Sequence, residues 1–189
     1  TEGRMATICD TKKVLAKSLL QLCEKKTFDK VSVHDIVQNC NAGRQTFYNH
    51  FHDKYDLTFW FITYNANLIA EQTHRSNEGW TYFLRTYLRF VNDNIGFFKG
   101  LCEHSSHATL SERLVVHFGA LYSVFYLPYT SVIDCAFRSG DAGMLSFAAR
   151  FYCCGLLSIA KTWLRGGAKD APETLAEQLA SVAPALEPV

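Results

Sequence analysis

Proline is scarce in this chain, and net charge is small. Only four prolines occur in 189 residues, and three of them lie after residue 171. Because proline interrupts helices, most of the chain is free to form them without a break. The formal net charge is +1, so charge alone identifies neither a nucleic-acid-binding nor a membrane-binding protein. Few runs alternate polar and apolar residues, which argues against a β-sheet protein.

Motifs that carry enzyme chemistry are missing as well. There is no Gly-rich phosphate loop, Gly-x-Ser-x-Gly or His-Glu-x-x-His sequence, and the acidic residues are scattered. The seven cysteines form no C-x-x-C pair or zinc-type cluster, and no signal peptide is apparent ahead of them. We expect Cys153 and Cys154 to be inert, because apolar surroundings raise the pKa of a thiol. The expectation is a cytoplasmic protein with no enzyme activity, cofactor or metal site.

Hydrophobic residues at helical spacing are abundant in the N-terminal part. A first helix is predicted over residues 10–26, with Asp10 as its N-cap. Ser32 and Asp35 form a variant of the capping box and predict the start of a second, short helix. Asn41 suits a left-handed turn position, and Gly43 is an acceptable N-cap for a third helix. These signals predict three helices within the first 53 residues, of which the second and third are short.

The remaining chain is more apolar, and its helical segments are longer. Residues 92–100 are rich in polar residues and glycine, which predicts a break there. The segment 144–164 approaches transmembrane length, but Arg150 and Lys161 lie within it, so a covering subunit is the favoured interpretation. The fold class is therefore all-α, with an N-terminal three-helix domain over residues 1–53 and a C-terminal helical bundle that dimerises over residues 54–189. The long predicted segments are 54–74, 80–91, 111–125, 144–164 and a last helix from Pro172.

The third predicted helix has two different faces. Phe47 and Phe51 are one turn apart and face inward, whereas Arg44, Gln45 and Asn49 lie on the polar side. Two short helices joined by a tight turn, the second with amides and a guanidinium on its outer face, are typical of a helix-turn-helix that enters the DNA major groove. An ordinary helical hairpin with a polar outer face fits the same spacing.

The residues in this region also resemble a known family. Ser32-Val-His-Asp-Ile-Val, the turn at Asn41 and Thr46-Phe-Tyr-Asn-His-Phe51, followed by Lys54 and Leu57, resemble the DNA-binding domain of the TetR/AcrR transcriptional regulators. The stretch 151–167 and Pro172 are similar to a terminal helix of the branch of dihydroxyacetone-kinase regulators. The resemblance implies an all-helical, dimeric, DNA-binding regulator, a repressor in the usual case, without catalytic residues. Asn41 and Gly43 replace the Gly and the Ser-type cap that are usual in the family.

Specific DNA contacts follow from the chemistry of the exposed side chains. Arg can bond guanine edges, and Gln or Asn can bond adenine, so Arg44 and Gln45 are predicted to read bases. Tyr48 and Lys54 are predicted to contact phosphates, with Ser32 and His34 assisting from the start of the second helix. The predicted partner is a double-stranded DNA operator. The full predicted DNA-binding set is Ser32, His34, Arg44, Gln45, Thr46, Tyr48, Asn49, His50 and Lys54.

A dimer interface is predicted on the most apolar segment. Several residues there follow four-residue steps, and Gly155 would allow a partner backbone to approach closely. Two leucines of the last helix would complete a four-helix interface in a homodimer. The alternative is that the same stripe is intrachain core. The predicted set is Phe147, Phe151, Gly155, Ile159, Trp163, Leu175 and Leu179.

Aromatic residues are dense beyond residue 60, which predicts either a packed core or a pocket for a small apolar or aromatic effector. Glycines at 96, 100 and 119 would leave gaps between neighbouring rings. A partner protein that controls the C-terminal domain is the alternative to a ligand. A cavity would favour the ligand, and a filled core with an exposed apolar patch would favour the partner. The predicted pocket residues are Trp60, Tyr64, Phe83, Tyr87, Phe118, Tyr122 and Phe125.

Overall fold

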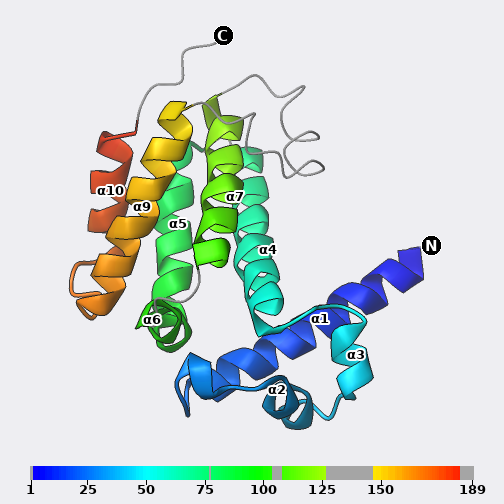
Figure 1. The fold of residues 1–189 in the computed structure, drawn as a ribbon. Helices are drawn as coiled ribbons and strands as arrows, with labels where there is room; N and C mark the ends of the chain where they lie inside the picture. The colour runs from blue at the N-terminus through cyan, green and yellow to red at the C-terminus, as the bar shows by residue number, and fades with distance from the viewer. Residues whose placement is uncertain (1, 77, 104–107, 127–146, 184–189) are drawn as a thin grey trace. The chain divides into compact units, whose positions relative to one another are not determined.

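A computed structural model describes residues 2–76, 78–103, 108–126 and 147–183 of the chain. All regular elements within these ranges are helices (Figure 1), which confirms the predicted all-α fold. The chain forms two compact units: residues 1–64 with 94–105, and residues 65–93 with 106–189. The functional division at residue 53 stays a prediction, because the long helix that follows it contributes to both units.

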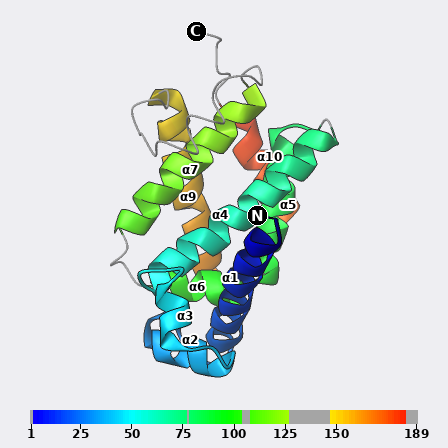
Figure 2. The same cartoon turned by 90° about the vertical axis from the view of Figure 1, so that its right-hand side faces the viewer.

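The first unit contains the predicted three-helix domain. The short helices α2 and α3 lie side by side next to α1 (Figures 1 and 2). Leu15, Leu19, Ile36 and Phe47 are buried in the core that these helices share. The elements of this unit are α1 (Glu2–Cys23), the 3-10 helix η1 (Phe28–Lys30), α2 (Val33–Asn39), α3 (Arg44–Tyr48), the first part of α4 (Lys54–Arg75) and α6 (Ile95–Glu103).

One boundary prediction in this unit was wrong, and another was right only in part. Helix α1 begins at Glu2 and ends at Cys23, so Asp10 lies inside the helix instead of capping it. The break predicted within 92–100 falls at Asn94 alone, because residues 95–103 form α6. Gly100 is buried in α6, and a Cβ at this position would lie 3.4 Å from the backbone nitrogen of Phe28. This is an ordinary van der Waals distance, so Gly100 lies at the contact between α6 and η1 inside a continuous helix, where local sequence rules predict a break.

The second unit is a bundle built from the later helices. Helix α10 packs against α5, and α9 packs against α7 (Figure 1). A buried chain of hydrogen bonds joins three of them: Trp80 Nε1 donates to Tyr152 Oη at 3.0 Å, and Tyr152 Oη donates to the Leu179 carbonyl at 2.9 Å. The helices that belong wholly to this unit are α5 (Trp80–Asp93), α7 (Ala108–Tyr126), α9 (Phe147–Arg165) and α10 (Pro172–Ser181).

Helix α9 covers most of the apolar segment predicted over 144–164, whose first three residues lie outside the described ranges. Pro172 occupies the first turn of α10, as predicted. No helix in the described part of the chain combines the length and the hydrophobicity that a membrane span needs.

Candidate functional site

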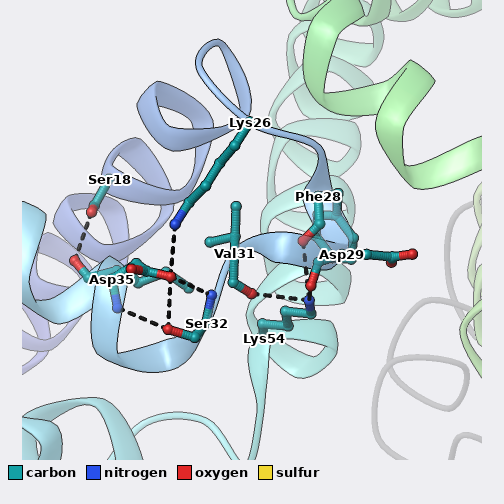
Figure 3. Close-up of polar contacts among 9 residues, drawn as sticks. Ser18, Lys26, Phe28, Asp29, Val31, Ser32, Asp35 and Lys54 are labelled. Atoms are coloured by element: carbon teal, nitrogen blue, oxygen red, sulfur yellow. Dashed lines mark hydrogen bonds and ion pairs between the residues drawn. The ribbon is translucent and has the colours of Figure 1, made fainter.

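Polar contacts hold α2 against α1. Ser18 lies on the buried side of α1, and its Oγ donates a hydrogen bond to the Ile36 carbonyl at 2.7 Å (Figure 3). Asn39 Nδ2 donates to Ser18 Oγ at 3.1 Å and to Gln21 Oε1 at 3.0 Å. Sequence reasoning missed this group. A serine at position 18, between the apolar positions 15 and 19, was the available signal, because a buried hydroxyl needs a partner.

The N-terminus of α2 carries the predicted capping box. Ser32 Oγ accepts from the Asp35 backbone N–H, and the Ser32 backbone N–H donates to Asp35 Oδ2 at 2.8 Å. Lys26 Nζ lies 2.8 Å from the same carboxylate oxygen (Figure 3). The Lys26 ammonium, together with the hydrogen bonds from Ser32, holds the pKa of Asp35 well below its usual range. The first turn of α2 is therefore ordered by an ionised, multiply bonded carboxylate.

The turn between α2 and α3 is a Schellman motif. Asn41 has φ 53°, in the left-handed region, as predicted. The Ala42 N–H donates to the Val37 carbonyl at 2.8 Å, and the Asn41 N–H donates to the Gln38 carbonyl at 3.3 Å. Gly43 then caps α3 in an extended conformation. Asparagine tolerates the left-handed region, so this turn does not require a glycine at position 41.

Aromatic rings anchor α3, which ends at Tyr48, so Phe51 lies beyond the helix on which it was predicted. Phe47 and Phe51 are buried, with ring centroids 5.8 Å apart. The ring of Phe51 lies 5.9 Å from that of Trp60 on α4, and Lys12 Nζ lies 5.3 Å from the Phe51 centroid. The Trp60 ring and the Lys12 ammonium thus hold Phe51 in place next to α3. Sequence reasoning did not identify the cation–π contact of Lys12.

The opposite face of α3 is exposed and polar. Arg44, Gln45, Tyr48 and Asn49 are all exposed, and 53% of the Tyr48 surface is accessible. Gln45 Nε2 donates to Asn49 Oδ1 at 2.9 Å, so two of these side chains are already linked. The structure therefore brings the four residues together on one surface, as the spacing predicted.

The other residues of the predicted DNA-binding set lie around this surface. Ser32 and His34 are exposed at the start of α2, while Thr46 and His50 are partly buried. The Ser32 hydroxyl donates to Asp35 Oδ2 at 2.7 Å, so its proton already has an acceptor.

Lys54 has a different environment from the predicted one. Its Nζ donates to the carbonyls of Phe28 at 3.0 Å, Asp29 at 2.9 Å and Val31 at 3.0 Å (Figure 3). An ammonium group has three N–H donors, and all three are used here. Partial burial lowers the pKa of Lys54 below its ordinary value, and the negative charge of nearby Asp29 offsets only part of this effect. The ammonium is directed at η1, so we leave Lys54 out of the proposed phosphate contacts.

The predicted dimer residues separate into two groups. Phe151 is 74% exposed, Ile159 is 45% exposed, and a Cβ on Gly155 would meet nothing within 4 Å. Trp163, Leu175 and Leu179 are instead buried within the chain, which corresponds to the alternative of an intrachain core. Phe147 begins α9, but its side chain is outside the described part.

Helical geometry explains the separation. Four residues advance a helix by about 400°, so a four-residue stripe drifts by about 40° at each step. Over the three steps from Phe151 to Trp163 the drift carries the side chain from the exposed face into the core. There the Trp163 Nε1 donates to the Asp170 carbonyl at 3.0 Å.

The predicted pocket residues also divide. Trp60 and Tyr64 belong to the first unit, where their rings stack at 4.9 Å. The others lie in the second unit and contact one another: Phe83 stacks on Tyr87 at 5.8 Å, and Tyr87 meets Phe118 at 5.1 Å. Trp80, absent from the prediction, contacts both Tyr122 and Phe125. These contacts are those of a packed aromatic core.

The adjacent cysteines of α9 differ in their surroundings. Cys153 is buried, and desolvation raises the pKa of its thiol to about 12. Cys154 is exposed. The expectation of two thiols in apolar surroundings therefore fits Cys153 and not Cys154.

Comparisons with known proteins agree with this architecture. Residues 78–184 match the TetR family described as "Transcriptional regulator C-terminal region". The chain is 32% identical over 91 residues to the HTH-type dhaKLM operon transcriptional activator DhaS of Lactococcus lactis subsp. lactis (strain IL1403). This match covers 47% of each protein, so the chain spans about half the length of the curated relative.

Solved structures share the fold over nearly the whole chain. The dihydroxyacetone kinase operon activator DhaS is 19% identical with a TM-score of 0.62, covering 92% of this chain and 93% of that one. The TetR-family repressor FadR of Thermus thermophilus, solved with lauroyl-CoA, is 12% identical with a TM-score of 0.55, covering 91% and 92%. The family match covers more than half of this chain, and the chain therefore belongs to the TetR family of transcriptional regulators.

Proposed function

We propose that the chain regulates transcription by binding double-stranded DNA in a sequence-specific manner through α2, the Asn41 turn and α3. The observation that carries this proposal is the two-faced segment 44–51, formed by α3 and the three residues that follow it, with Phe47 and Phe51 buried and its polar residues exposed. Anchored aromatics hold the helix rigidly, which a surface that reads base edges requires. An ordinary hairpin has no need to gather a guanidinium, two amides and a phenol on one face.

Each exposed group has a role in this proposal. Arg44 and Gln45 contact base edges, because guanidinium and amide groups match the guanine and adenine edges. Tyr48 contacts a phosphate from the side of the same surface. Ser32 and His34 at the start of α2, with Thr46 and His50, form the surrounding part of the interface.

We also propose that the regulator acts as a homodimer through the exposed face of α9. Between Arg150 and Arg165, every exposed residue of this helix is uncharged. A helix face that exposes Phe151 and Ile159 without charge is suited to pairing with its own symmetry copy. Two recognition helices would then address the half-sites of a pseudopalindromic operator.

Control of the C-terminal unit has two candidate sources. A small apolar or aromatic effector is the first, and the lauroyl-CoA complex of the Thermus thermophilus protein supports it by analogy. The packed contacts among Phe83, Tyr87 and Phe118, together with exposed apolar residues such as Val182, favour the second candidate, a partner protein. A useful switch needs a difference in affinity between two states of about 1–3 kcal/mol.

The family resemblance and the curated relative point to opposite signs of regulation. The family resemblance favours a repressor, whereas the Lactococcus lactis relative is described as an activator. A reporter gene placed under the operator that the protein binds distinguishes the two, when its expression is measured with and without the regulator. Reduced expression supports repression, and increased expression supports activation.

The proposal is tested by selecting DNA from a random pool with the purified protein. We expect enrichment of a pseudopalindrome and loss of preference at one or two positions per half-site in the Arg44→Ala variant. Each bidentate contact supplies about 1–3 kcal/mol of discrimination. Recovery of unenriched DNA would contradict sequence-specific binding. A screen of small aromatic and short-chain carbonyl compounds for shifts in Tm and operator affinity then tests the effector.

A further inference from the structure

The amide side chains of Gln45 on α3 and of Asn49, the C-cap of this helix, are hydrogen-bonded to each other. Gln45 Nε2 donates to Asn49 Oδ1 at 2.9 Å, and the Asn49 backbone N–H donates to the Gln45 carbonyl at 2.9 Å. Both residues are exposed. The two bonds join the residues once through the backbone and once through the side chains, so the Gln45 amide is oriented by its neighbour one turn later.

The bond to Asn49 leaves a defined set of groups on Gln45. One N–H of Nε2 is used, while Oε1 and the second N–H remain for a ligand. An amide with one acceptor and one donor side by side complements adenine, which offers N7 as acceptor and N6–H as donor in the major groove. Guanine offers two acceptors at the same edge and is the partner of a guanidinium, such as that of Arg44.

Orientation matters because a free glutamine side chain is mobile. Glutamine is among the residues that lose the most rotamer freedom when the side chain is fixed. The Asn49 carboxamide restricts this freedom in the unbound protein, so less is lost when the base is bound.

We propose that Gln45 reads adenine in each operator half-site and that Asn49 is the positioning residue that holds the Gln45 amide for this contact. This inference rests on the proposed DNA-binding function and assigns the base class that one position of the surface selects. Asn49 and Gln45 then form one recognition unit, and removal of either side chain has the same effect on sequence preference.

The test measures base preference in DNA selected by the full-length protein and its variants. We expect one adenine per half-site whose selection over the other bases falls roughly tenfold to a hundredfold in Gln45→Ala. Asn49→Ala should lose preference at the same position, with unchanged affinity for random DNA. Gln45→Glu should shift the preference from adenine to cytosine, because a carboxylate accepts from cytosine N4. Gln72→Ala, an exposed glutamine of α4, serves as the control and should change nothing.

The outcomes separate this inference from the function on which it rests. If the wild-type protein enriches no sequence, DNA recognition itself is refuted. If it enriches an operator but Gln45→Ala keeps every base preference, the adenine assignment is refuted alone. If Gln45→Ala loses the preference and Asn49→Ala keeps it, the positioning role of Asn49 is refuted. All substituted residues are exposed, and equal melting temperatures verify that the variants are folded.

Discussion

The ammonium of Lys54 lies 2.9 Å from the carbonyl oxygen of Asp29, 25 residues earlier in the chain. With the Phe28 and Val31 carbonyls it forms three hydrogen bonds that fasten the first residue of α4 to η1. Lys54 also lies 4.8 Å from the Phe28 ring centroid. Since Ser32, the cap of α2, follows Val31 directly, this group fixes where α2 begins relative to α4.

We predict that Lys54→Met weakens DNA binding without changing its salt dependence. The substitution removes three charge-assisted hydrogen bonds but keeps the apolar stem, so we expect the free energy of unfolding to fall by about 1–3 kcal/mol. Affinity should fall for all sequences, with the slope of log affinity against log salt unchanged, because no phosphate contact is lost. Fluorescence anisotropy at several salt concentrations provides the measurement.

The control for this prediction is Lys30→Ala, which removes an exposed lysine of η1 and should leave the unfolding free energy unchanged. A slope reduced by about one unit in Lys54→Met would show instead that the ammonium contacts a phosphate.

Because the pKa of Asp35 is lowered in the folded protein, we predict that the free energy of unfolding depends on pH. Its folded pKa is held below the value of about 3.9 expected for an unfolded chain. The carboxylate therefore contributes stability above about pH 5, and this contribution is lost as the pH falls through 4 toward the folded pKa. We expect Asp35→Asn to lower the unfolding free energy by about 1 kcal/mol at pH 7, and the difference from the wild type to shrink steadily as the pH falls from 5 toward 2. Urea unfolding across this pH range measures the difference.

Glu24→Gln provides the comparison, since Glu24 is an exposed carboxylate of the segment that follows α1. Its unfolding free energy should follow that of the wild type at every pH. A constant deficit of Asp35→Asn from pH 7 to pH 2 would contradict a role for the ionised carboxylate.

Local signals in the sequence were sufficient to predict the helix-turn-helix. Ser32 and Asp35 form their capping box within three residues, and Asn41 supplies the left-handed turn by its own conformational tolerance. The spacing of Phe47 and Phe51 defines which side of α3 is buried. Each of these features depends on residues close in the chain, so periodicity and capping rules could find them.

Contacts between distant segments could not be predicted in the same way. The partners of Lys54 depend on how α4 meets η1, and the burial of Leu179 depends on the packing of α10 against α5. Periodicity shows that a stripe is apolar, but it does not show which neighbour covers it. This explains why intrachain core residues and exposed residues were grouped together on the predicted dimer face.

We predict that removal of the Tyr152 hydroxyl lowers the unfolding free energy of the second unit strongly. It accepts from Trp80 Nε1 and donates to the Leu179 carbonyl in a buried environment. Tyr152→Phe leaves a buried donor and a buried acceptor without this partner, so we expect the unfolding free energy to fall by about 1–3 kcal/mol. Tyr82→Phe, at a partly exposed tyrosine of α5, should change it by much less. Equal denaturation midpoints for the two variants would contradict this role of the hydroxyl.

We predict that a substitution on the exposed face of α9 dissociates the dimer without unfolding the chain, whereas a substitution in the buried core unfolds it. Phe151 is 74% exposed, so Phe151→Asp should leave the chain folded while it introduces an unpaired charge into the proposed interface. Leu179 is buried, so Leu179→Asp should unfold the second unit instead. Sedimentation velocity and circular dichroism distinguish the two outcomes, and a folded dimer in Phe151→Asp would exclude this face as the interface.

The native thiol of Cys154 gives a second measurement of the same interface. Cys154 is exposed beside Gly155, and two α9 helices that cross at this glycine bring the two Cys154 thiols within reach of a short bismaleimide linker. We expect the wild type to form a covalent dimer and Cys154→Ser to form none. Phe151→Asp should also lose the crosslink while its Cys154 still reacts with a monofunctional maleimide, because dissociation separates the thiols without burying them. A crosslinked dimer that persists in Cys154→Ser would assign the bond to another cysteine and remove this support for the α9 interface.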